Sequence, residues 1–110
     1  MGGGGERVEV SLYTVFITPN TLREIKDLPG NVRQRVKRAV SGLATEPRPT
    51  QSKLLDVPDA EYELRRLRID RWRIIYAITE ADKVIDVLGV RKRPPYDYGD
   101  LGSLLEHIRG

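Results

Sequence analysis

The 110-residue chain has no cysteine and a single histidine, His107. The absence of cysteine excludes a disulfide framework, a thiolate metal site and a cysteine nucleophile. With only one histidine, zinc chemistry built on several imidazole ligands is excluded as well. A phosphate-binding loop of the Walker type is also missing, because the glycines at 2–5 are not followed by Lys-Ser or Lys-Thr.

Long hydrophobic runs are equally scarce. The longest unbroken apolar stretches, such as Ile74–Ile78, have only a few residues, whereas a membrane-spanning helix needs about 20. Met1 precedes four glycines rather than a charged segment and an apolar stretch, so no signal peptide is expected. We expect a cytoplasmic protein without a membrane partner, with a flexible Gly-rich tail over residues 1–7 and a single domain over residues 8–110.

What the chain has instead is a concentration of basic residues. Nineteen Lys and Arg stand against sixteen Asp and Glu, for a net charge of +3. Their placement matters more than this modest total, because arginines crowd residues 65–73 and basic residues recur at 91–93. Such a patch favours phosphate-rich partners, and the alternative is a solvated charged surface.

The hydrophobic pattern predicts the order β-α-α-β-β-β-α. Residues 8–18 are rich in β-branched and aromatic side chains, as in a strand, and Thr18-Pro19 is a helix-start signal. We therefore expect an α+β fold in which an N-terminal αα-hairpin over residues 19–45 packs on a small antiparallel sheet of about four strands. Two sets of helix residues are expected to face the sheet: Leu22, Ile25 and Leu28, and then Val32, Val36, Val40 and Leu43.

The second half of the chain holds three strand signals and a short terminal helix. The strands are predicted at residues 62–69, 72–79 and 84–91, and the helix at 101–108. Between the αα-hairpin and the first of these strands we expect a loop that runs to about Asp59, with Leu54 and Leu55 as apolar anchors.

One strand of this sheet carries two apolar pairs that are out of phase. Tyr62 and Leu64 share one face, whereas Leu67 and Ile69 share the other. Because a strand alternates with period two, both pairs can face one core only if an extra residue is inserted between them. We therefore predict a β-bulge at Arg65–Arg66. The bulge would leave four residues on the side opposite the core: Glu63, Arg65, Arg66 and Arg68.

Adjacent antiparallel strands would bring the arginines together on one face. Guanidinium groups hold phosphate bidentately and stack on bases, and an aromatic side chain beside them can stack an unpaired base. This chemistry suits single-stranded RNA. The alternative is that the arginines form cross-strand ion pairs with Glu61, Glu63 and Asp70. The residues expected to bind RNA are Arg65, Arg91, Lys92 and Tyr98.

A series of short motifs runs in a fixed order along nearly the whole chain. The motifs are Leu28–Arg33, Leu43–Arg48, Lys53-Leu54, Tyr62–Arg65, Trp72–Tyr76, Val87–Arg93 and Tyr96–Tyr98. This series, from about residue 10 to 98, resembles the RelE/ParE superfamily of toxins. Within it the RelE-like mRNA interferase branch fits better than the gyrase-poisoning ParE branch, because of the Arg-Trp-Arg-Ile-Ile-Tyr strand and the basic ending followed by tyrosines.

The resemblance implies a RelE-like fold and the toxin component of a type II toxin–antitoxin system. Such a toxin is a ribosome-dependent endoribonuclease that cuts mRNA by attack of a 2′-hydroxyl on the neighbouring phosphate, with no metal and no small-molecule cofactor. The implied partners are mRNA, the ribosome and a cognate antitoxin protein that covers the site. Two alternatives stay open: a ParE-like inhibitor of DNA gyrase, and a catalytically weak RNA-binding protein of the same fold.

The resemblance also assigns catalytic residues. Arg73 matches the family's phosphate-binding arginine, and Arg93, or alternatively Arg91, matches the basic residue after the last strand. The C-terminal tyrosine of the family matches Tyr96 or Tyr98. The full set expected to act in catalysis is Arg66, Arg68, Arg73, Arg93 and Tyr96.

The general base is less determined, because arginines stand where the best-known RelE toxins have lysines. Tyr96 is our first choice, since the rigid Pro94-Pro95 pair holds it close to Arg93 and adjacent guanidinium groups would favour its phenolate. Tyr98 is the alternative, and Glu63 is third.

Overall fold

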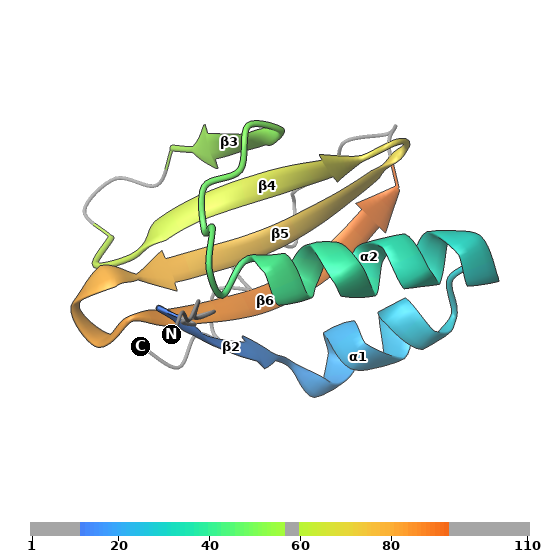
Figure 1. The fold of residues 1–110 in the computed structure, drawn as a ribbon, viewed down its shortest axis with the longest axis horizontal. Coiled ribbons are helices and arrows are strands. Elements are labelled where there is room, and N and C mark those ends of the chain that lie inside the picture. The colour runs from blue at the N-terminus through green and yellow to red at the C-terminus, as the bar shows by residue number, and fades with distance from the viewer. Residues whose placement is uncertain (1–11, 57–59, 93–110) are drawn as a thin grey trace, which may run out of the picture.

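The computed structural model describes residues 12–56 and 60–92. They form β2 (Thr14–Ile17), α1 (Pro19–Lys26), α2 (Gly30–Gly42), β3 (Ser52–Leu55), β4 (Glu63–Ile69), β5 (Trp72–Thr79), the 3-10 helix η1 (Glu80–Asp82) and β6 (Val84–Lys92), as Figure 1 shows. None of the described helices has the length and apolar character needed to cross a membrane. The predicted Gly-rich tail of residues 1–7 and the terminal helix of residues 101–108 lie outside the described residues.

The α+β class and the αα-hairpin are confirmed, with two differences in the sheet. The sheet has five strands in the order β2-β6-β5-β4-β3, rather than about four. It is mixed rather than purely antiparallel, because β2 runs parallel to β6, with Thr14 opposite Val84 and Ile17 opposite Val87. A parallel pair needs a long connection, and the two helices and three intervening strands provide it.

The strand that we did not predict from the sequence is β3, which forms one edge of the sheet. We predicted this segment as part of a loop, but Lys53 pairs with Arg66 and Leu55 with Leu64 of β4. Leu54 is 61% exposed and is not an anchor, whereas Leu55 packs on a buried cluster. Four residues without clear alternation give little local signal, so tertiary pairing decides their structure.

The start of α1 follows the sequence. Thr18 is the N-cap, and its Oγ1 accepts a hydrogen bond from the amide of Thr21 at 3.3 Å, with Pro19 in the first turn. Ile25 is buried as predicted, but Leu22 is 42% exposed. The fully buried Thr21 takes the inward position on this turn instead.

The apolar stripe of α2 packs on the sheet as its spacing predicts. Val36, Val40 and Leu43 are at most 4% exposed. They join Ile74, Tyr76 and other residues in the larger of two buried clusters. Figure 1 shows α2 running across this face of the sheet, which we call the helix-covered face.

The predicted β-bulge at Arg65–Arg66 is wrong. The pairing of β4 with β5 is regular from Glu63 opposite Ile78 to Ile69 opposite Trp72. The bulge lies in β6, where Leu88 is the extra residue opposite the step from Ile75 to Tyr76.

The out-of-phase pairs of β4 have a different explanation: both faces of the sheet bury apolar side chains. Leu67 packs in the helix-covered cluster, while Leu64 packs in a second cluster on the other face. The remaining members of that cluster are Ile75, Ala77, Leu88, Leu55 and Tyr62. In a regular strand Arg65 therefore shares the helix-covered face with Leu67, and Arg66 and Arg68 lie on the second face.

Candidate functional site

The second face of the sheet carries five basic residues in two neighbouring rows across the strands. In the row nearest the β4–β5 turn, Arg68 of β4, Arg73 of β5 and Arg91 of β6 lie opposite one another. In the next row, Lys53 of β3 lies opposite Arg66 of β4. We call these five residues the basic patch. The structure thus brings four of the sequence-predicted site residues onto one face. It adds Lys53, which we had not predicted as a site residue because its segment was expected to be a loop.

Such an arrangement has the chemistry of an anion-binding surface. Like charges directly opposite each other on paired strands repel, and the carboxylate of Glu24, which pairs with Arg91 at 3.0 Å, offsets part of this repulsion. Bound anions would offset more of it. Guanidinium groups match phosphate bidentately, and a lysine adds a point charge. The basic patch is therefore suited to the phosphates of a nucleic acid.

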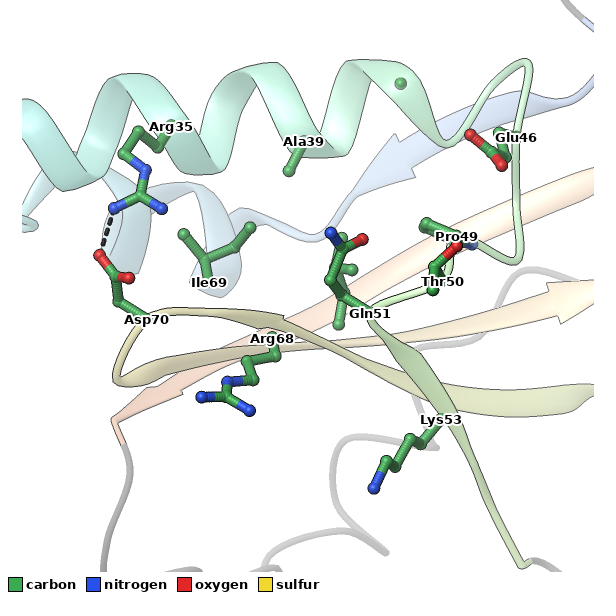
Figure 2. A pocket seen from close by; sticks show the side chains of 12 residues that line it. Arg35, Ala39, Glu46, Pro49, Thr50, Gln51, Lys53, Arg68, Ile69 and Asp70 are labelled. Carbon is green, nitrogen blue, oxygen red and sulfur yellow. Dashed lines mark hydrogen bonds and ion pairs between the residues drawn. The ribbon is translucent and has the colours of Figure 1, made fainter.

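Arg68 is the most accessible arginine of the patch. It is exposed, and among the described residues no hydrogen bond involves its guanidinium group. Figure 2 shows Arg68 and Lys53 extending from the side of the sheet that faces away from α2.

Arg73 is held inside the patch rather than on its surface. It is only 4% exposed, and its Nη1 donates to the carbonyl oxygens of Asp70 and Trp72, each at 3.0 Å. Asp70 has a left-handed φ of 53° in the β4–β5 turn. Because Arg73 braces this turn, replacing it is expected to affect folding as well as anion binding.

Arg65 lies apart from the basic patch. Its Nε donates to Ser52 Oγ at 3.0 Å, and its Nη1 pairs with Glu63 at 2.6 Å. The expectation that Arg65 and Glu63 share a face with Arg66 and Arg68 is wrong because β4 has no bulge. Arg65 is thus in an ion pair with Glu63, but within β4 rather than across two strands as the alternative from the sequence had it.

Glu63 is poorly suited to act as the general base. Arg48 contacts its carboxylate through Nε and Nη2 at 3.0–3.1 Å, and Arg65 contacts it as well. The hydrogen bonds from Arg48, followed by those from Arg65, lower the pKa of Glu63 below its ordinary value. The Glu63 carboxylate already accepts hydrogen bonds from two arginines, Arg48 and Arg65. It also lies on the face of the sheet opposite to Arg66 and Arg68.

Lys92 ends β6 opposite Trp72, with its Nζ 6.0 Å from the centre of that ring. It is exposed and belongs to the edge of the helix-covered face. The other predicted site residues, Arg93, Tyr96 and Tyr98, lie outside the described residues.

A hollow of about 630 Å³ lies between α2 and the β3–β4 edge. One end is closed by an ion pair between Arg35 and Asp70 (Figure 2). Its lining includes Glu46 as well as these two residues, so acidic and basic groups are mixed. Lys53 and Arg68 of the basic patch also line this hollow, so it borders the patch at the β3–β4 edge. Because acidic and basic side chains are mixed in its lining, we place the candidate site on the basic patch itself.

An ion-pair network stabilises the helix-covered face at the end where β5 connects to β6, away from the β4–β5 turn. Arg48 joins Glu63 to Glu80, and Glu80 also accepts a hydrogen bond from Tyr13 Oη at 2.9 Å and pairs with Lys83. Lys83, then Arg48 and Tyr13, lower the pKa of Glu80 from 4.5 to about 2. The carboxylates of Glu63 and Glu80 raise the pKa of Arg48 further above its already high value.

This network predicts a pH-dependent stability. A carboxyl whose pKa is lower in the folded state contributes stability above its unfolded pKa and loses it as the pH falls through the folded value. The contribution of Glu80 is therefore complete above about pH 5 and gone near pH 2. We expect Arg48→Gln to lower the melting temperature by a few degrees at pH 7, with the difference shrinking toward pH 2. Arg38→Gln removes an exposed arginine of α2 and is the control, and a pH-independent Arg48 effect would contradict the prediction.

Comparisons with known proteins place this fold among bacterial and archaeal toxins. The sequence profile described as "ParE toxin of type II toxin-antitoxin system, parDE" matches residues 15–94. A curated relative, the candidate toxin RelE1 of Methanocaldococcus jannaschii, is 26% identical over 81 residues, which cover 74% of this chain and 90% of the relative.

Solved structures agree with this placement. The archaeal RelE–RelB complex from Pyrococcus horikoshii OT3 contains a chain that is 26% identical with a TM-score of 0.69, covering 76% of this chain and 98% of that one. The RelBE2 toxin–antitoxin complex from Mycobacterium tuberculosis contains one that is 27% identical with a TM-score of 0.61, covering 74% and 98%. The free E. coli RelE toxin, in an arginine double variant, shares the fold at 23% identity and a TM-score of 0.64, covering 88% and 98%.

These matches show that the chain is a small toxin of the RelE/ParE superfamily. More particularly, the chain belongs to the ParE toxin family of type II toxin–antitoxin systems.

Proposed function

We propose that the chain is a ribosome-dependent mRNA endoribonuclease that cuts by attack of a 2′-hydroxyl on the adjacent phosphate. The observation that carries this proposal is the basic patch, in which Arg68, Arg73 and Arg91 lie in register on three strands. This reaction needs a cationic clamp on the phosphate and groups that move protons. The patch would supply the clamp, and the residues after β6, Arg93, Tyr96 and Tyr98, would supply a further cation and the proton transfer.

We further propose that a cognate antitoxin protein binds this chain. Structural neighbours from P. horikoshii and M. tuberculosis are themselves toxins in complex with an antitoxin. In this proposal the free toxin acts on mRNA in the cytoplasm and its complex does not.

The experiment that tests the function is induced expression followed by mapping of mRNA 5′ ends on ribosomes. Cuts phased with codons would support the endoribonuclease. A second candidate is inhibition of DNA gyrase, favoured by the match of residues 15–94 to the ParE toxin profile. Intact mRNA together with broken DNA would select that candidate and overturn the first.

Removing Arg68 is expected to weaken RNA binding without unfolding the protein. Phosphate contacts release counterions, so losing one contact makes the dependence of affinity on salt shallower by about 0.7 in log–log slope for a single strand. Because Arg68 is exposed, the melting temperature of Arg68→Ala should stay close to that of the parent. Titrating a fluorescent RNA oligonucleotide at several salt concentrations measures the affinity and its salt dependence, and thermal unfolding measures the melting temperature.

The matched control is Arg38→Ala, which removes an exposed arginine on the solvent side of α2. If Arg38→Ala changes the slope as much as Arg68→Ala does, binding follows the net charge of the protein and not the basic patch.

A further inference from the structure

Arg91 is tied to the helical layer by a carboxylate of α1. Glu24 accepts a hydrogen bond from Arg91 Nη1 at its Oε2, at 3.0 Å, and from the backbone amide of Val90 at its Oε1, at 2.9 Å. The parallel pairing of β2 with β6 ends at Ile17 opposite Val87. Beyond that point Glu24 provides an acceptor for the Val90 amide where β2 no longer pairs with β6.

The backbone of β6 is shaped to fit the Arg91 side chain. A Cβ atom at Gly89 would lie 2.9 Å from Arg91 Nη1 and 3.3 Å from its Cζ, so the guanidinium group folds back over this glycine. Arg91 Nη1 also donates to the Val90 carbonyl at 3.1 Å. Both hydrogens of Nη1 thus have acceptors, which fixes the plane of the guanidinium group.

We propose that Glu24 is a positioning residue of the RNA-binding surface: together with Gly89 it holds the Arg91 guanidinium in the orientation that receives a phosphate. The proposal rests on the function proposed above. Its value lies in preorganisation, because a long side chain that is already ordered loses less conformational freedom when RNA binds. Glu24 acts through Arg91 and is not expected to touch RNA.

This role makes a prediction opposite to that of simple electrostatics. Removing an acidic residue raises the net positive charge, which by itself strengthens RNA binding. If Glu24 positions Arg91, Glu24→Gln instead weakens the binding of a single-stranded RNA oligonucleotide and the rate of cleavage on programmed ribosomes, each by roughly tenfold. The glutamine side chain can still accept from the Val90 amide, so the fold is retained.

Two further variants test whether the effect runs through Arg91. Gly89→Ala places a methyl group where the guanidinium lies and should cause a similar loss. In an Arg91→Ala background, Glu24→Gln should cause no additional loss. Glu46→Gln is the charge-matched control: it neutralises an exposed carboxylate near the end of α2 and should leave RNA binding unchanged or slightly stronger.

RNA binding by Glu24→Gln that equals or exceeds that of the parent would overturn the positioning role, as would an additive loss in the Arg91→Ala background. A second measurement does not depend on RNA. The NMR order parameter of the Arg91 Nε–H group should fall in Glu24→Gln, and an unchanged value would equally overturn the proposal. If the parent neither binds nor cuts RNA, the proposed function fails, and the order parameter alone then decides whether Glu24 holds Arg91.

Discussion

Replacing Tyr96 by phenylalanine is expected to slow cleavage on programmed ribosomes by roughly 10²–10⁴-fold, the usual contribution of one positioned proton donor or acceptor. The substitution removes only the hydroxyl, so binding of mRNA should change little. Arginine stays protonated at neutral pH and cannot easily act as a base. The basic patch therefore needs a different group for proton transfer.

The structure narrows the choice of that group. Glu63 is engaged by Arg48 and Arg65 as a carboxylate on the helix-covered face. Tyr96 is four residues beyond Lys92, the last residue of β6, and four residues span at most about 14 Å. Arg91 of the basic patch lies next to Lys92 in β6. The length of chain between Lys92 and Tyr96 therefore allows Tyr96 to reach the basic patch.

Single-turnover cleavage by Tyr96→Phe, Tyr98→Phe and Glu63→Gln separates the candidates. We expect Tyr96→Phe to be the slowest, and Glu63→Gln to cut at nearly the parent rate. A slow Tyr98→Phe beside a fast Tyr96→Phe would move the assignment to Tyr98. If all three cut like the parent, positioning by the arginines alone supplies the catalysis.

The features that the sequence predicts well are those set by local spacing. The Thr18 cap depends on residues three positions apart, and the stripe of Val36, Val40 and Leu43 depends on the helical repeat. Both the αα-hairpin and its packing on the sheet follow from such short-range patterns. The resemblance to known toxins likewise depends on short motifs in order, and the comparisons confirm it at the level of the superfamily.

The features that it misses depend on pairing between distant segments. We predicted a bulge in β4 because we assumed that only one face of the sheet is buried. In the structure Leu64 and Leu67 pack in two clusters on opposite faces. The basic patch gains Lys53 only when β3 is seen to pair with β4. Glu24 lies 67 residues from Arg91 along the chain, and nothing in the spacing of α1 indicates that contact.

Replacing Val36 by aspartate is expected to unfold the domain. Val36 has no exposed surface, and it lies in the cluster that joins α2 to the helix-covered face. An aspartate there would bury a charge without a partner, or force α2 away from the sheet. Either outcome costs several kcal/mol, against a total stability of about 5–15 kcal/mol for a domain.

Circular dichroism and thermal unfolding measure this effect. Gln34→Asp is the matched control, because it introduces the same residue and the same change in charge at an exposed position of α2. The control should unfold cooperatively near the parent melting temperature, while Val36→Asp should show no cooperative transition. Val36→Thr keeps the shape of the side chain and adds one hydroxyl, so an intermediate stability is expected. If Val36→Asp melts within a few degrees of the parent, α2 does not depend on this face for its attachment, and the αα-hairpin must be held to the sheet mainly through α1.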